Sequence, residues 1–110
     1  MVYYPVKAED VNEEAILAEV GKGWSYLIRI FLGLVKEHGL LICQVKGKFG
    51  GLRLYYMYDK PCTTEDAEII EEIIHSLEIV SAYTCENCGA PGEAREHNQT
   101  LCDTCDKEKK

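Results

Sequence analysis

The 110-residue chain has no apolar stretch long enough to cross a bilayer. Its first residues, Met1-Val-Tyr-Tyr-Pro5, run directly into charged residues, so the start lacks the apolar segment of a secretory signal. The chain also contains no low-complexity linker. These absences predict a soluble, cytoplasmic protein with no membrane partner, built as one domain or as one small domain plus an appendage.

Basic residues are in the minority, since 12 Lys and Arg stand against 19 Asp and Glu and the formal net charge is −7. This balance argues against a protein that coats the phosphate backbone of a duplex. The few cations are unevenly placed. No acidic residue lies between His38 and Tyr58, whereas Lys46, Lys48 and Arg53 all fall in this stretch. The sequence therefore predicts a locally basic segment in an acidic protein.

Sequence patterns of common enzymes are absent as well. The chain has no Gly-x-Ser-x-Gly, no phosphate-binding P-loop and no His-Glu-x-x-His. The zinc deaminase pattern fails, because no His-x-Glu precedes a Pro-Cys-x-x-Cys. We therefore predict that the protein is not an enzyme and name no catalytic residue.

Cysteine, in contrast, is abundant, and four of the six cysteines form two Cys-x-x-Cys motifs separated by 13 residues. Two such turns facing each other make a tetrahedral four-sulfur site, which suits Zn²⁺. Four thiolates saturate the ion, so the predicted role of the zinc is structural. The predicted ligands are Cys85, Cys88, Cys102 and Cys105.

Other uses of these cysteines stay open at this point. A secreted domain would join them in disulfides, although a reducing compartment favours metal. A thiol oxidoreductase also uses Cys-x-x-Cys, but it needs a helix N-terminus at the motif, and neither motif is expected to open an amphipathic helix. His97 is an alternative ligand, more simply explained as a turn residue. Cys43 and Cys62 are interpreted as inert small apolar residues.

Hydrophobic periodicity and turn signals predict an α+β fold with the order α-α-β-β-α, followed by a zinc-ribbon-like module. A capping box at 10–13 opens a short helix that ends near Gly21, and apolar residues at helical spacing predict a second helix over Gly23–Glu37 with Gly39 as its left-handed cap. Two strands, Leu40–Lys46 and Leu52–Tyr58, flank a turn at 48–51.

The third predicted helix begins after Thr63 and runs to about Ala82, with its apolar stripe at Ile70, Ile73, Ile74, Leu77 and Val80. Glu93–His97 and Gln99–Cys102 are expected to pair across His97-Asn98 and to link the two cysteine turns. These patterns divide the chain into a two-layer α+β domain over 1–82 and a zinc-binding module with a short charged tail over 83–110.

Two surfaces are candidate binding sites. Lys46, Lys48, Phe49 and Arg53 combine cations with aromatic rings, as in proteins that bind single-stranded nucleic acid, although an ordinary hairpin with solvated cations explains them too. The acidic helix, including Glu65, Glu68 and Glu72, suits docking to a protein partner or serves only solubility. Oligomeric state is open, and the unusually apolar helix around Trp24–Val35 permits a dimer.

The segments Gln44-Val-Lys-Gly-Lys-Phe-Gly-Gly-Leu-Arg53 and Thr84-Cys-Glu-Asn-Cys-Gly-Ala-Pro-Gly92 resemble a family of small uncharacterised bacterial and prophage proteins. The resemblance covers roughly residues 23–105, and it implies a bound zinc ion and a compact single unit, with no known activity to transfer. Our hypothesis is a non-catalytic, zinc-stabilised interaction protein, phage-encoded, that binds and modulates a host protein, for example by inhibiting a defence nuclease. The alternative is a nucleic-acid-binding regulator that uses the Lys46–Arg53 hairpin and the zinc ribbon.

Overall fold

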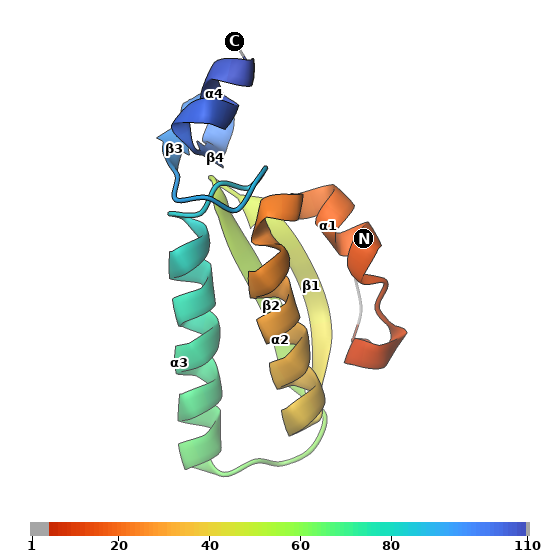
Figure 1. Cartoon of the computed structure of the whole chain (residues 1–110). Helices are drawn as coiled ribbons and strands as arrows, with labels where there is room; N and C mark the ends of the chain where they lie inside the picture. The colour runs from red at the N-terminus through yellow and green to blue at the C-terminus, as the bar shows by residue number, and fades with distance from the viewer. Residues whose placement is uncertain (1–4, 110) are drawn as a thin grey trace.

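A computed structural model describes residues 5–109 and confirms the α+β fold (Figure 1). Short 3-10 turns, labelled η, lie among four helices and two small antiparallel sheets. The order is η1 (Ala8–Asp10), α1 (Glu13–Val20), η2 (Lys22–Trp24), α2 (Ser25–His38), β1 (Leu40–Lys48), β2 (Gly51–Tyr58), α3 (Thr64–Ser81), β3 (Glu93–Arg95), η3 (Glu96–Asn98), β4 (Gln99–Leu101) and α4 (Asp103–Lys109). Within the described part of the chain, we find no helix that meets the length and hydrophobicity needed to span a membrane.

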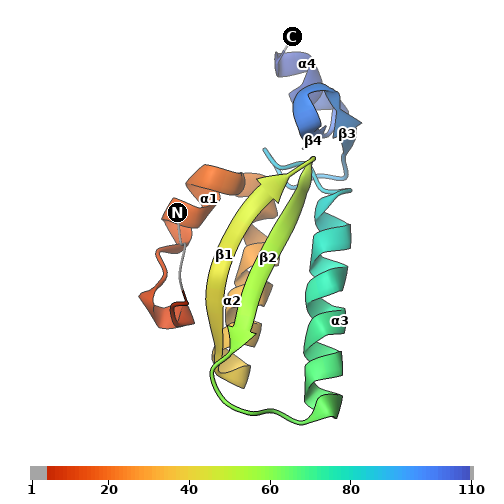
Figure 2. The same ribbon diagram turned by 180° about the vertical axis from the view of Figure 1, so that it is seen from behind.

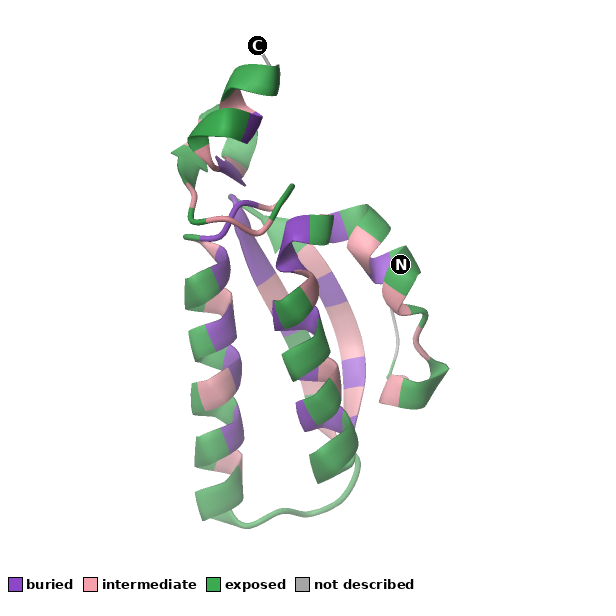
Figure 3. Cartoon of the chain, viewed as in Figure 1, coloured by how far each residue is buried: buried purple, intermediate pink, exposed green. Residues whose placement is uncertain are grey.

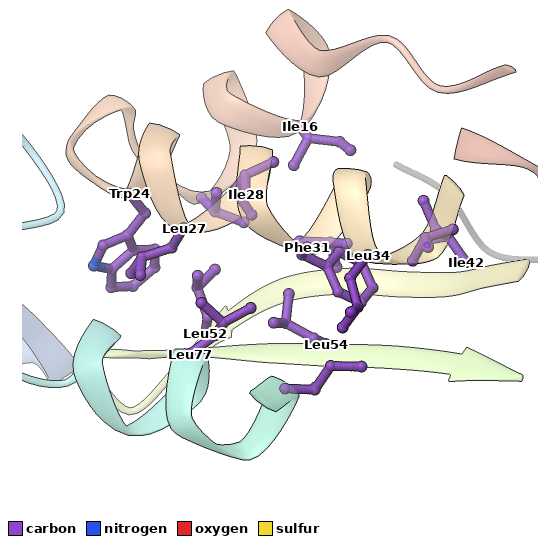
Figure 4. Close-up of a cluster of buried hydrophobic side chains, with 14 of the residues drawn as sticks. Ile16, Trp24, Leu27, Ile28, Phe31, Leu34, Ile42, Leu52, Leu54 and Leu77 are labelled. Atoms are coloured by element: carbon purple, nitrogen blue, oxygen red, sulfur yellow. The ribbon is translucent and has the colours of Figure 1, made fainter. Parts of the chain in front are cut away.

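The β1–β2 hairpin forms one layer, and α2 and α3 form the other (Figures 1 and 2). Apolar side chains at helical spacing on α2, among them Leu27, Ile28 and Phe31, pack over the hairpin and meet Leu52 and Leu54 of β2 (Figure 4). Stacking the two layers removes the apolar side chains on their facing sides from water. Helix α2 is capped at its C-terminus by Gly39, which adopts the predicted left-handed conformation with φ 63°.

Both outer edges of the hairpin are partly occupied. On the β1 edge, Val6 and Ile42 exchange two backbone hydrogen bonds of 3.0 and 2.8 Å. On the β2 edge, the amides of Leu52 and Leu54 donate to Ser81 Oγ and Glu78 Oε2 of α3, each at 2.8 Å. Unpaired edge amides invite pairing with another chain, so these contacts protect the sheet. They also show that Glu78 supports the fold rather than belonging only to a solvated acidic face.

The hairpin turn has the predicted positive φ values, at Phe49 (53°) and Gly50 (78°). A β-bulge lies in β1, because the register shifts between Ile42 and Gln44 and leaves Cys43 unpaired. The bulge changes the alternation, so that Ile42 and Val45, three residues apart, both face the core.

Several predicted details are wrong. The cap of α1 is Asn12, whose side chain accepts from the amide of Ala15, because 8–10 already form a 3-10 turn and exclude a capping box at Asp10. Helix α2 starts at Ser25, two residues later than predicted, since 22–24 form another 3-10 turn. Val80 is 42% exposed and lies outside the core. The cap of α3 is confirmed: Thr63 accepts from the amide of Asp66.

Candidate metal centre

The four predicted ligands come together at one end of the molecule, above the ends of α2, α3 and the hairpin turn (Figure 1). Their Sγ atoms all lie within 4.8 Å of one another, and those of Cys88 and Cys102 are 3.6 Å apart. Sulfurs about 2.3 Å from a tetrahedral zinc ion are separated by about 3.8 Å. Among residues 5–109 this is the one group of three or more Cys, His, Asp or Glu side chains placed to share a metal ion.

Each Cys-x-x-Cys motif uses a different local structure. Cys85 follows the end of α3, and the backbone then folds back through a hydrogen bond of 2.9 Å from the amide of Gly89 to the carbonyl of Cys85. Gly89 has φ 87°, which explains a glycine directly after Cys88. In the second motif, Cys102 precedes helix α4, and its Sγ accepts from the amide of Cys105 at 3.4 Å. The second motif therefore opens a helix, but a short one without an apolar stripe, so the prediction that neither motif opens an amphipathic helix is not contradicted.

The surroundings of the four thiols differ. Cys85 is buried, which raises the pKa of its thiol, but backbone amides of Cys102, Cys88 and Asn87 stabilise the thiolate and bring the pKa to about 6. At Cys105 the Asn87 amide, 3.2 Å from Sγ, lowers the pKa, whereas the three neighbouring cysteines raise it, to about 12. Without a cation the cluster favours one thiolate and opposes more, so four thiolates together call for a positive ion.

A short antiparallel ribbon joins the two motifs. Strands β3 and β4 pair with Glu93 opposite Leu101, and η3 connects them. The predicted ribbon is confirmed in outline but is shorter, because η3 takes up 96–98. His97, at φ 62°, lies in this connection and outside the four-cysteine cluster, as a turn residue rather than a ligand. Cys43 and Cys62 also lie outside the cluster.

The cysteine turns press directly on the first half of the chain. The amide of Gly23 donates to the carbonyl of Glu86 at 2.8 Å. A Cβ at Gly23 would lie 1.9 Å from the carbonyl oxygen of Cys85, and one at Gly21 would lie 2.4 Å from that of Glu86. The glycines at 21 and 23, which the sequence marks only as a break between helices, are therefore required by this contact. The sequence shows the two glycines, but it does not show why they are needed, because the backbone that they contact lies some 60 residues further along the chain.

Two side chains complete this junction. Trp24 is buried, and its indole Nε1–H donates to the carbonyls of Ser81 and Thr84, at 3.1 and 3.0 Å, where α3 leads into Cys85. Thr100 of the ribbon donates its hydroxyl to the carbonyl of Gly50 in the hairpin turn at 2.5 Å. Hydrogen bonds thus link the cysteine module to η2 and to the hairpin turn, and two more hold the end of α3 against η2.

The candidate binding residues form two separate surfaces. On the hairpin, Lys46 lies opposite Arg53 in the strand register, and Lys48 and Phe49 follow at the turn. Glu65, Glu68 and Glu72 are exposed on α3. The same helix and its C-terminal continuation expose large apolar side chains. Sequence patterns did not single out Ile69, Ile79 and Tyr83, and they placed Val80 in the buried stripe. Figure 3 shows exposed residues along the sides of α2 and α3 that face away from the hairpin.

Comparison of the chain with protein-family models, with curated proteins and with solved structures finds no match. The resemblance to a prophage family therefore stays a prediction.

Proposed function

We propose that this protein is a non-catalytic interaction module whose C-terminal part is stabilised by a structural zinc ion and whose partner is another protein. The metal assignment rests on the four Sγ atoms, which all lie within 4.8 Å of one another. Four sulfur ligands in this arrangement suit zinc, or iron in an iron–sulfur protein. Four thiolates leave no coordination position for a catalytic water, which supports a structural role. Thiolate ligands also suit a reducing compartment such as the cytoplasm.

Metal analysis of the purified protein tests the zinc assignment. We expect one zinc per chain by mass spectrometry, and cobalt substitution giving the absorption bands of a tetrahedral tetrathiolate site. Cys88→Ser should abolish the cobalt spectrum, whereas Cys62→Ser, at an exposed cysteine outside the cluster, should leave it unchanged. Iron in place of zinc, or an unchanged spectrum in Cys88→Ser, would contradict the assignment.

The outer side of α3 supports a protein partner. Ile69, Ile79 and Val80 are 53%, 49% and 42% exposed, and Tyr83, just beyond the helix, is 68% exposed. Exposed apolar side chains rimmed by charged residues are typical of protein interfaces. The rim is acidic, since Glu65, Glu68 and Glu72 lie on the same helix, so the partner surface should be apolar and basic. We propose that the partner is a host protein; a basic, nucleic-acid-binding surface of a nuclease has this chemistry.

Affinity capture with charge-matched variants tests this surface. A triple variant, E65Q/E68Q/E72Q, removes three charges from the outer side of α3, and E9Q/E96Q/E108Q removes three exposed charges elsewhere. A true partner should be captured by the wild type and by the second variant but lost from the first. A partner retained by both variants, or lost from both, would show that this side of α3 does not carry the interaction.

A further inference from the structure

One side of the hairpin faces away from α2 (Figure 2). On this side the strand register places like charges opposite each other. Because of the bulge at Cys43, Lys46 lies directly opposite Arg53 in the register, and Lys48 follows two positions on. Like charges at directly opposed positions of a sheet repel each other. Among the described residues, none of these three cations has a carboxylate within ion-pair distance. Within the described part of the chain, no ion pair offsets this repulsion.

Aromatic rings lie beside these cations. The Nζ of Lys46 is 5.5 Å from the ring centre of Tyr55, and the Nζ of Lys48 is 5.2 Å from that of Phe49. The two rings are exposed, Tyr55 by 44% and Phe49 by 67%. Each ring therefore offers a face to a ligand while holding a positive charge nearby.

Phe49 is also conformationally unfavourable. It adopts φ 53° at a turn position where glycine or asparagine fits without strain. The conformation of Phe49 lowers stability, and its ring buries little surface in return. Such a residue is more simply explained by a contact with something outside the chain.

We propose that this surface, formed by Lys46, Lys48, Phe49, Arg53 and Tyr55, binds single-stranded nucleic acid. The cations contact phosphates, and the two rings stack on bases, a combination that recognises unpaired bases without reading their sequence. A duplex hides its base faces, and three cations on a protein of net charge −7 are too few to follow it. From the turn to Tyr55 the surface spans four residues, about 14 Å, which accommodates a short single-stranded segment. The site includes none of the side chains proposed above for the protein partner.

Fluorescence anisotropy of the metal-loaded full chain, with labelled oligo(dT), oligo(U) and a duplex of matched length, tests this proposal over a range of salt concentrations. We expect binding to the single strands, much weaker binding to the duplex, and a log–log salt slope of about −2, as three phosphate contacts predict.

Substitutions locate the site. Phe49→Gly should weaken binding about tenfold through the lost stacking, and it should raise the melting temperature because glycine accepts the positive φ. Lys46→Gln should make the salt slope shallower by about 0.7. Tyr83→Ala removes an exposed ring from another surface, and Lys36→Gln removes an exposed charge from α2; neither should change the affinity for oligo(dT) appreciably.

Three outcomes would overturn the proposal. One is the absence of any anisotropy change with either single strand at low salt. Another is an equal loss of affinity in Phe49→Gly and Tyr83→Ala. The third is binding of an oligo-glutamate peptide as tightly as the oligonucleotides, since that would identify a general anion-binding or acidic-peptide surface.

Discussion

The two ends of the molecule differ in what holds them together. In the part of the chain before Cys85, 16 buried hydrophobic residues form one continuous core between the hairpin and the helices. After Thr84, the buried hydrophobic cluster consists of Cys85, Leu101 and Cys105, two of which are candidate metal ligands. Burying apolar surface stabilises by about 25 cal/mol per Å², so three such residues contribute little. The larger unit is stabilised by its own core, whereas the cysteine module buries too little apolar surface to be stabilised in the same way.

The two regions are nevertheless closely joined. The cysteine turns lie against Gly23, the indole of Trp24 holds the end of α3, and Thr100 reaches the hairpin turn. A difference in the source of stability therefore does not make the module an independent appendage. We therefore expect metal loss to affect the cysteine module and core mutation to affect the larger unit, whereas mutations at the junction should affect both.

Metal removal should have the largest effect. Zinc binding to small thiolate sites is worth about 10–16 kcal/mol, so a strong chelator should unfold residues 83–106 while α2 and α3 keep their helical signal. Amide NMR spectra and far-ultraviolet circular dichroism measure the two regions separately. If the amide spectrum of the ribbon stays unchanged after complete metal removal, the module has another source of stability and the comparison fails.

A core substitution should act on the other region. Phe31 is fully buried between α2 and the hairpin, so Phe31→Ala should destabilise the α/β unit by about 4 kcal/mol. Chemical denaturation followed by Trp24 fluorescence measures the loss. The metal cluster contacts other segments, so the cobalt spectrum of the folded variant should match that of the wild type. A changed cobalt spectrum would show that the core and the metal site are coupled beyond the junction.

The junction itself is tested by a pair of glycine substitutions. Gly23→Ala places a methyl group 1.9 Å from the carbonyl oxygen of Cys85, and the overlap should cost about 3 kcal/mol and weaken zinc binding. Gly33→Ala is the matched control, since its Cβ meets nothing within 4 Å in the middle of α2. That substitution should raise stability by about 1 kcal/mol. Equal effects of the two would mean that the cysteine turn does not press on Gly23.

Trp24→Phe should have the smallest effect. The variant keeps an aromatic ring in the core but removes the N–H that the carbonyls of Ser81 and Thr84 accept. The loss of a buried hydrogen-bond donor should cost about 1–2 kcal/mol. Because Thr84 precedes Cys85, zinc affinity in a competition with a coloured chelator should fall slightly as well. If Trp24→Phe keeps the stability and zinc affinity of the wild type, then the contacts of Gly21 and Gly23 alone couple the two regions.

Much of this fold could be predicted from local patterns. The apolar spacing around Leu27 and Phe31 predicted α2, Gly39 predicted its end, and Thr63 predicted the start of α3. Each of these features depends on residues within about one helical turn. The clustering of the four cysteines was predicted for the same reason, since each Cys-x-x-Cys is a local motif. Helix α4 was missed because its seven residues carry no apolar stripe and begin inside the second cysteine motif.

Other features depended on contacts between distant segments. Val80 fits the apolar periodicity of α3, yet it is exposed because the core contacts a narrower side of the helix than the pattern suggests. The bulge at Cys43 has no sequence signal that we could identify, although it turns Lys46 and Lys48 away from the core.

By itself, therefore, the sequence determined the three longer helices, the hairpin and which four cysteines gather, because short-range geometry and side-chain chemistry decide them. Only the tertiary structure decided which surfaces meet and which stay exposed. It placed the cysteine turn against Gly23 and one sheet edge on Ser81 and Glu78. It also placed a row of cations, with no ion pair to any residue that the structure describes, on the side of the hairpin that faces away from α2. These arrangements depend on how separate elements pack, and no local pattern contains that information.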